Sequence, residues 1–153
     1  MHKINQALLI LIFAFSAPVF ADDATSRIIE NGGTGKFPAV MMTESSLPTH
    51  TVFRPQNIEK FKGRKSMPLI VWGNGACFDS PFEHVNFLNE IASHGFMVVA
   101  IGTLPKETGE QNKERSTSAK LTVAIDWALA QNADKNSPYF KKNNEKKIVF
   151  KYF

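Results

Sequence analysis

Residues 68–104 read PLIVWGNGACFDSPFEHVNFLNEIASHGFMVVAIGTL, and this stretch decides the fold. At its start lies the apolar run Met67 to Trp72, which is rich in β-forming residues and ends at Gly73. Near its close lies a second apolar run, Phe96 to Ile101. Short apolar runs bounded by glycine are typical of strands buried on both faces of a sheet. We therefore expect two buried strands.

The residues between these runs predict a helix. Ser80 at the N-cap, Pro81 at the first helical position and Glu83 three residues after the cap form a capping box. His94 falls in the last turn, and Gly95 supplies the left-handed residue that ends the helix. One face is apolar and consists of Phe82, Val85, Leu88, Ile91 and Ala92. A strand, a helix and a strand in this order predict a right-handed crossover between parallel strands.

The residues before this unit predict an antiparallel pair of strands. Phe37 to Thr43 and Thr49 to Arg54 are strand-like, and the turn residues Ser46 and Pro48 separate them. A basic loop, Phe61 to Ser66, then leads into the crossover unit.

A second crossover is predicted downstream. Pro105 to Ser116 is polar and is expected to be a surface loop. Thr117 or Ser118 can cap the next helix, whose apolar face consists of Leu121, Ala124, Ile125, Ala128 and Leu129. Lys147 to Phe150 then predicts a third parallel strand. The fold class is therefore α/β, with antiparallel N-terminal strands followed by a parallel βαβαβ arrangement.

Length and charge set limits on function. A chain of 153 residues suffices for one domain, and the net charge of +4 is modest. The basic cluster around Lys141 to Lys151 could contact nucleic acid or anionic lipid, but we interpret it as a solvated connection ahead of a strand. Aromatic and basic residues do not alternate as they do in proteins that bind single strands, so no nucleic-acid partner is expected.

The N-terminus predicts an export signal. Lys3 supplies a positive charge, Ala7 to Phe15 is apolar, and small residues precede a cleavage site after Ala21. We expect a periplasmic or secreted protein without stable membrane insertion once residues 1–21 are removed; the alternative is an uncleaved anchor. Residues 22–36 are polar and glycine-bearing, so a disordered lead-in is expected.

Three segments resemble a known family. They read Trp72-Gly73-Asn74-Gly75-Ala76-Cys77, Ile91-Ala92-Ser93-His94-Gly95-Phe96 and Met97-Val98-Val99-Ala100-Ile101-Gly102. Together they resemble the N-terminal half of an α/β-hydrolase, near the dienelactone-hydrolase, cutinase-like and polyester-hydrolase branches. The resemblance implies that residues 37–153 form part of such a domain. It also implies an exported serine-type hydrolase acting on small-molecule or polymeric carboxylic esters, with no cofactor.

The resemblance also implies an oxyanion hole. In this family, a backbone N–H of the loop after the third strand stabilises the negative charge that develops on the substrate oxygen. Matching Asn74-Gly75 to the family's motif assigns that donor to Ala76, with Cys77 as the alternative. Gly73, Asn74 and Gly75 would support the loop.

The nucleophile of this family is not found. It would lie in a G-x-S-x-G turn shortly after the fifth strand, which ends near Phe150, but that motif does not occur in the sequence. We therefore expect a fragment of a hydrolase, a truncated or frameshifted product or part of a longer chain, with no Ser/Asp/His triad and no triad hydrolysis as it stands.

Other reactive residues have ordinary structural explanations. His50 lies beside a strand, His84 is expected to be solvated, and His94 suits the negative end of a helix dipole. Two carboxylate pairs lie in polar turns and predict no metal site: Asp79 with Glu83, and Glu107 with Glu110.

Two functions other than ester hydrolysis remain open. The segment Cys77-Phe78-Asp79-Ser80 reads C-x-x-S between a strand and a helix, as in a monothiol relative of the thioredoxin motif, where a helix N-terminus would favour the thiolate. Cys77 is the only cysteine, so it could also be a small buried apolar residue or half of a disulfide whose other half lies elsewhere. The second of these functions is that of a small exported binding module without chemistry.

Overall fold

The computed structural model describes residues 25–28, 32–103 and 114–152. Its strands are β1 (Thr25–Ile28), β2 (Ala39–Thr43), β3 (His50–Pro55), β4 (Met67–Gly73), β5 (Met97–Ile101) and β6 (Asn143–Tyr152). Its helices are the 3-10 turns η2 (Gly63–Lys65), η3 (Gly75–Cys77) and η4 (Phe82–His84), and the α-helices α1 (Val85–Ser93) and α2 (Ala119–Ala133). The export signal and its cleavage site lie outside the described residues.

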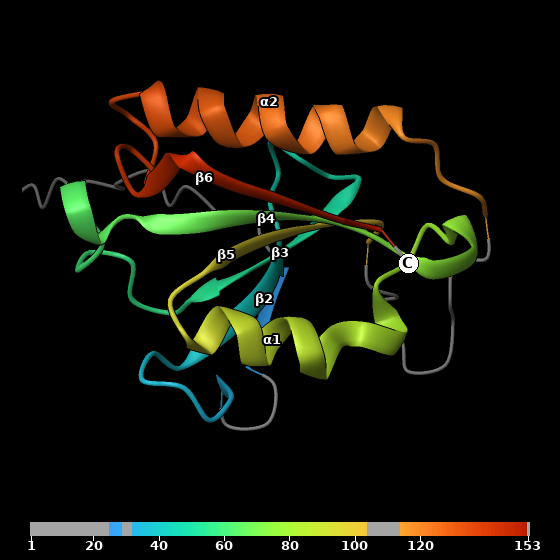
Figure 1. Ribbon diagram of the computed structural model, residues 1–153, viewed down its shortest axis with the longest axis horizontal. Helices are drawn as coiled ribbons and strands as arrows, with labels where there is room; N and C mark the ends of the chain where they lie inside the picture. The colour runs from blue at the N-terminus through green and yellow to red at the C-terminus, as the bar shows by residue number, and fades with distance from the viewer. Residues whose placement is uncertain (1–24, 29–31, 104–113, 153) are drawn as a thin grey trace, which may run out of the picture.

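The strands form one mixed sheet covered on both faces. Its order is β1-β2-β3-β5-β4-β6, with α2 on one face and α1 on the other (Figure 1). Strand β4 pairs in parallel with both β5 and β6, whereas β1, β2, β3 and β5 pair with one another in antiparallel fashion. The predicted α/β class, with antiparallel strands followed by parallel ones, is confirmed.

The first crossover helix ends as predicted but begins later. Gly95 has φ +94°, and its N–H donates to the carbonyl of Ala92 at 2.9 Å. The capping-box prediction is wrong, because the hydroxyl of Ser80 accepts a hydrogen bond from the N–H of Phe82, at 3.3 Å, and not from Glu83. Just before Ser80, the N–H of Asp79 donates to the carbonyl of Glu114. The chain then turns through η4, and the α-helix starts at Val85.

The lead-in prediction also needs correction. Residues 25–28 form β1, and the segment before Phe37 docks on the last turn of α1. The N–H of Gly35 donates to the hydroxyl of Ser93 at 2.9 Å, and the N–H of Phe37 donates to the carbonyl of Ser93 at 2.9 Å. A helix C-terminus leaves carbonyls without intrahelical donors, and this segment supplies one. A polar, glycine-bearing composition did not reveal this long-range partner.

The second crossover follows the predicted apolar face with one addition. Leu121, Ala124 and Ala128 are buried, whereas Leu129 remains 36% exposed. The addition is Trp127, which is buried and donates its indole N–H to the hydroxyl of Ser46 at 2.9 Å. The helix starts after Ser118 as expected, although the Ser118 side chain makes no capping hydrogen bond.

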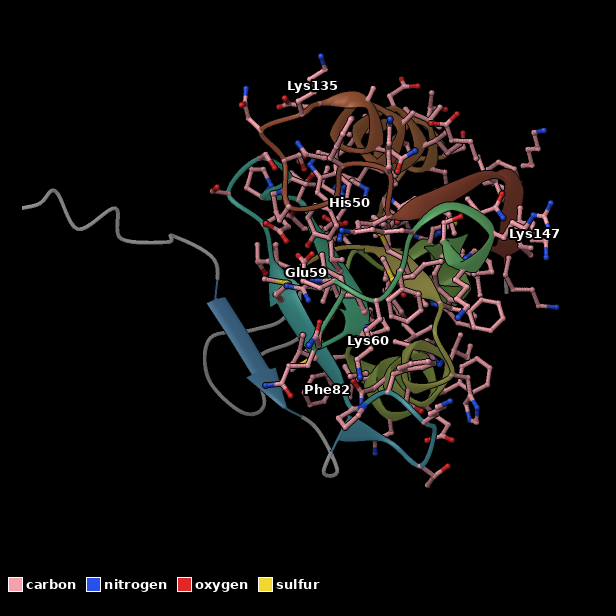
Figure 2. The ribbon with its side chains drawn as sticks, turned by 90° about the vertical axis from the view of Figure 1, so that its left-hand side faces the viewer. His50, Glu59, Lys60, Phe82, Lys135 and Lys147 are labelled. Atoms are coloured by element: carbon pink, nitrogen blue, oxygen red, sulfur yellow. The ribbon has the colours of Figure 1, made fainter. Side chains whose placement is uncertain are left out.

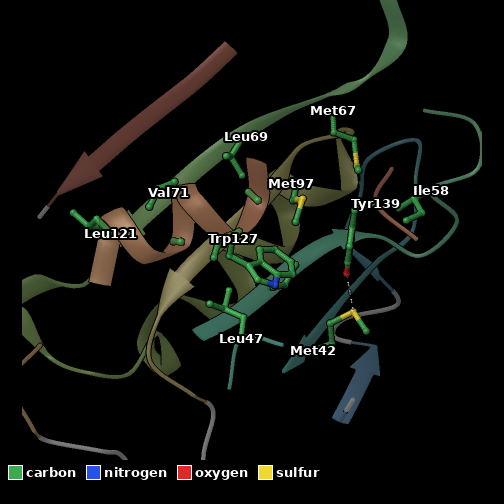
Figure 3. Packing of buried hydrophobic residues seen from close by; sticks show 14 of the residues in the cluster. Met42, Leu47, Ile58, Met67, Leu69, Val71, Met97, Leu121, Trp127 and Tyr139 are labelled. Carbon is green, nitrogen blue, oxygen red and sulfur yellow. Dashed lines mark hydrogen bonds between the residues drawn. The ribbon is translucent and has the colours of Figure 1, made fainter. Parts of the chain in front are cut away.

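A large core lies between α2 and the sheet (Figure 3). Tyr139 is buried in it, beside Trp127, and its hydroxyl oxygen lies 3.7 Å from the sulfur of Met42. Its hydroxyl also contacts Glu44 and accepts from Arg54 Nε at 3.0 Å. Burial raises the pKa of Tyr139. The tyrosine therefore ties the connection between α2 and β6 to the antiparallel strands.

Candidate oxyanion-binding loop

The loop Gly73 to Asp79 follows β4 at the carboxyl end of the parallel strands, where ligands bind in open α/β sheets. It lies near the end of β6, the edge strand on this side of the sheet (Figure 1). Asn74 continues the chain in an extended conformation, and η3 follows it, closed by a hydrogen bond from the N–H of Phe78 to the carbonyl of Gly75 at 3.1 Å. The predicted supporting residues Gly73, Asn74 and Gly75 thus form the base of this loop.

The side chain of Asn74 fixes the loop to the sheet. Its amide nitrogen donates to the carbonyl of Phe78 at 2.9 Å and to that of Ile101 at 2.8 Å. Its amide oxygen accepts the indole N–H of Trp72 at 3.2 Å. Asn74 is only 3% exposed, and removal of its side chain would take away one hydrogen-bond partner from each of these groups. Asn74 therefore has a positioning role and contributes no reactive group.

Ala76 and Cys77 occupy an unusual backbone conformation. Their φ angles are 52° and 58°, in the left-handed region that costs a residue with a Cβ about 1–2 kcal/mol. Among the residues that the structure describes, neither backbone N–H makes a hydrogen bond outside the η3 turn itself. The two candidate donors are thus adjacent, and both registers of the predicted oxyanion hole remain open.

The segment that precedes α2 supports the loop from outside. The N–H of Asp79 donates to the carbonyl of Glu114 at 2.9 Å, and Phe78 pairs with Arg115 in an isolated β-bridge. Ser116 donates to the carbonyl of Cys77 through both its N–H, at 2.7 Å, and its hydroxyl, at 3.1 Å. Residues 114–116, expected to be an ordinary surface loop, therefore hold the backbone on the C-terminal side of Ala76.

Asp79 joins the loop to α2. Its carboxylate forms an ion pair with Lys120 at 2.6 Å, and its side chain is largely buried. The other carboxylate oxygen, Oδ1, has no hydrogen-bond partner among the residues that the structure describes. The ion pair, rather than a partnership with Glu83, explains this carboxylate.

His50 lies beneath this ion pair and is completely buried. Its Nε2 lies 2.9 Å from the carbonyl of Lys120, which can only accept, so Nε2 carries the proton. Its Nδ1 then accepts from the hydroxyl of Thr49 at 2.9 Å. Burial lowers the pKa of His50, so the ring is neutral at pH 7. Both nitrogens are occupied, which gives His50 a structural role.

The end of β5 passes very close to the loop. Gly102 has φ +92°, and a Cβ at this position would lie 2.3 Å from the carbonyl carbon and oxygen of Asp79. The carbonyl of Gly102 accepts from the hydroxyl of Thr51 at 2.8 Å. Gly102 is therefore needed for the close contact between the end of β5 and the loop Gly73 to Asp79. Gly102 belongs to the motif Met97 to Gly102, but its neighbours in the sequence do not predict this role.

The other histidines are not brought to the loop as catalytic groups. His94 pairs with Glu90 at 2.9 Å, and hydrogen bonds from Thr34 and His94 lower the pKa of Glu90 to about 2. The ring of His84 packs edge-on against Trp72, with centroids 5.3 Å apart, so His84 is half-buried and not fully solvated.

The described residues favour neither metal binding nor a helix-capped thiol. Within the described part of the chain, no group of three or more His, Cys, Asp or Glu side chains could hold a metal ion. Glu107 and Glu110 lie outside the described residues. The thiol of Cys77 is free and exposed, but α1 begins only at Val85, so the thiol does not cap that helix.

The sequence matches no protein-family model and no curated protein. None of the described helices is both long and apolar enough to span a bilayer.

Proposed function

We propose that the loop Gly73 to Asp79 is the oxyanion-binding side of an ester-hydrolase site of the α/β-hydrolase type. Ala76 supplies the backbone donor, with Cys77 as the alternative. The observation that carries the proposal is the pair of adjacent left-handed residues, Ala76 and Cys77, in a loop that the hydrogen bonds of Asn74 fix to the sheet.

The chemistry requires such rigidity. When a nucleophile attacks an ester, the carbonyl oxygen becomes an alkoxide, and donors already in place stabilise it without reorganising. Loss of one such donor typically reduces turnover by about 10²–10³-fold. The strained backbone at Ala76 and Cys77 supports this role, because unfavourable conformations persist where surrounding contacts enforce them and often mark functional sites.

The proposal covers binding more than turnover. Because no G-x-S-x-G occurs in the sequence, these 153 residues are expected to bind an oxyanion without hydrolysing esters. The substrate class is a small or polymeric carboxylic ester, and the proposed location is the periplasm or the exterior of the cell, on the basis of residues 1–21.

Amide chemical shifts test this proposal directly. A short-chain carboxylate or an alkyl phosphonate carries the oxygen charge that the loop would bind. Titrated into the ¹⁵N-labelled full chain, either should move the Ala76 or Cys77 amide resonance along a saturable curve, and the larger shift identifies the donor. The amide of Gly63, at the other end of β4, serves as the internal control. Unchanged resonances at both Ala76 and Cys77 would refute the proposal.

The exposed thiol of Cys77 gives a second candidate, an exported thioredoxin-like thiol protein. Cys77→Ser separates the two functions because it removes the thiol and keeps the backbone N–H. If the oxyanion proposal holds, this variant retains the carboxylate-induced shifts, and the wild-type thiol alkylates no faster than glutathione. Alkylation at least tenfold faster than glutathione, together with loss of the shifts in Cys77→Ser, would favour the thiol function. A binding module without chemistry would show neither response.

A further inference from the structure

Two basic segments that are far apart in the sequence meet at the amino end of β4 and β6. Residues 59–65 precede β4, and residues 134–147 comprise the connection from α2 to β6 and the first five residues of β6. The N–H of Met67 donates to the carbonyl of Lys142 at 2.7 Å, and the ammonium of Lys142 pairs with Glu59 at 2.9 Å. We call this surface the basic end. Its exposed basic residues are Lys60, Lys62, Arg64, Lys65, Lys135, Lys141, Lys146 and Lys147.

The basic end carries more than the net charge of the whole chain. Residues 59–65 contain four basic and one acidic side chain, a net +3, and residues 134–147 contain five basic and two acidic side chains, again a net +3. Together they carry +6 against +4 for the chain, so all other residues sum to −2. The sequence disperses these charges over two segments, and the fold concentrates them.

Local acidic groups do not cancel this charge. Glu59 pairs with Lys142, Glu145 accepts the Asn132 amide at 2.6 Å, and Asp134 accepts the N–H of Asn136 at 2.9 Å. Within the described part of the chain, Lys142 is the one basic residue of this surface that has an ion pair. The remaining ammonium and guanidinium groups therefore present a positive field to solvent.

We propose that the basic end docks on the surface of an anionic phospholipid bilayer. Lys60, Lys135 and Lys147 are spread across this end of the molecule (Figure 2). A broad array of lysines on flexible stems fits a plane of phosphate headgroups, each lysine near the surface contributing about 1 kcal/mol.

A nucleic-acid partner fits the same surface less well. Readout of bases or single strands uses arginine forks and exposed aromatic rings. The basic end holds a single exposed arginine, Arg64, and its Phe140 ring is already covered by the ammonium of Lys141 at 5.0 Å. The surface therefore offers charge without the groups that stack on or read bases.

The basic end and the candidate oxyanion-binding loop lie at opposite ends of β4. Strand β4 begins beside it at Met67 and ends at Gly73, where the candidate oxyanion-binding loop starts (Figure 1). Docking through the basic end would leave that loop on the side away from the bilayer. The inference does not depend on the proposed hydrolase function, because it uses none of the residues of that loop.

Vesicle co-sedimentation of the full chain tests the proposal. The test variant Lys62→Gln/Lys146→Gln removes one charge from each segment. The matched control Arg115→Gln/Lys151→Gln removes the same net charge at the carboxyl end of the sheet. Because the apolar stretch Ala7 to Phe15 could itself enter a bilayer, the readout is the difference between these two variants on phosphatidylglycerol-containing vesicles. The test variant should bind roughly thirtyfold more weakly than the control.

Three other measurements can overturn the proposal. Binding of the wild-type chain to the anionic vesicles should fall steeply between 50 and 300 mM salt, and should exceed binding to phosphatidylcholine vesicles. Equal binding of the two double variants, equal binding to the two lipids, or insensitivity to salt would each refute it. Tighter binding to duplex DNA than to the vesicles, lost in the test variant, would reassign the surface to nucleic acid.

Discussion

Hydrogen bonds and ion pairs hold distant segments together at both ends of the parallel strands, but the two ends present different groups to a ligand. At the carboxyl end, Asn74 makes three hydrogen bonds, Asp79 pairs with Lys120, and Ser116 holds the carbonyl of Cys77. At the amino end, a backbone hydrogen bond and the Lys142–Glu59 pair join the segments, and the other charged side chains face solvent. The carboxyl end is therefore defined by a backbone that hydrogen bonds hold in place, and the amino end by its exposed charges. Rigidity suits a site of developing charge, whereas flexible lysines suit a surface of fixed charge.

The largest difference in stability between these ends is expected when Gly102 at the carboxyl end and Gly63 at the amino end are each replaced by alanine. Gly102→Ala places a Cβ 2.3 Å from the backbone of Asp79 at φ +92°, so we expect a loss of about 3–5 kcal/mol in the free energy of unfolding. Gly63→Ala meets no atom within 4 Å at φ +57° and should lose about 1 kcal/mol. Urea denaturation measures both. Similar losses would show that the close approach of β5 to the loop is not real.

Asparagine substitutions should give the next difference. Asn74→Ala removes three hydrogen bonds, one with the Trp72 indole and two with backbone carbonyls, and we expect a loss of about 2–4 kcal/mol in the free energy of unfolding. The matched variant at the amino end is Asn144→Ala, which removes one exposed bond to the N–H of Lys146 and should lose less than about 1 kcal/mol. The same denaturation experiment compares them. A loss below 1 kcal/mol for Asn74→Ala would contradict the positioning role of this residue.

Acid should weaken the carboxyl end through His50. Because burial lowers the pKa of His50 below 6.5 in the folded chain, the unfolded chain takes up this proton first as the pH falls. Stability that is present above pH 6.5 is therefore lost below it, by at most about 1.4 kcal/mol at pH 5.5. Denaturation at pH 8.0 and pH 5.5 measures the loss, because the carboxylates with lowered pKa values, Glu59 and Glu90, release stability only below about pH 4.5.

The control for this pH effect is His94, which is exposed and paired with Glu90. His94→Gln should keep the loss between pH 8.0 and 5.5, and His50→Gln should abolish it. A wild-type chain that is equally stable at both pH values would show that His50 is not held neutral by burial.

The smallest effect is expected from relief of backbone strain. Ala76→Gly at φ 52° and Lys141→Gly at φ 56° each remove a left-handed residue with a Cβ, one at each end of the sheet. We expect each to gain about 0.5–1 kcal/mol, because relief of strain slightly exceeds the entropic cost of glycine. Only Ala76→Gly should weaken the carboxylate-induced shifts, since it loosens the proposed donor. Equal effects of both variants on those shifts would separate the strain from the proposed site.

Local chemistry was sufficient to predict much of the fold. The apolar run before Gly73 is confirmed as β4, and the left-handed Gly95 ends α1 as expected, because burial on both faces and a positive φ leave marks in adjacent residues. The start of α1 could not be predicted in the same way. Ser80 has the residue pattern of a capping box, but contacts of Asp79 with Glu114 and Gly102 determine how the chain enters the helix.

The candidate site shows the same division. The glycines and asparagine after β4 drew attention to the loop Gly73 to Asp79 because such residues allow tight turns and close approach. The contacts that hold this loop join Asn74 to Ile101, Asp79 to Lys120 and Cys77 to Ser116, and none of these partners is a sequence neighbour. Their identity depends on how the two crossovers bring strand ends together.

By itself, the sequence determined the order and type of the main elements, since periodicity and turn chemistry act over a few residues. Only the tertiary structure decided that a polar N-terminal segment docks on Ser93, that Trp127 joins the core and that two basic segments form one surface. These outcomes depend on long-range pairing and on the burial of side chains whose partners lie tens of residues away. Hydrogen bonds and charges depend on the distance between groups in space, and the spacing of residues in the sequence does not give that distance.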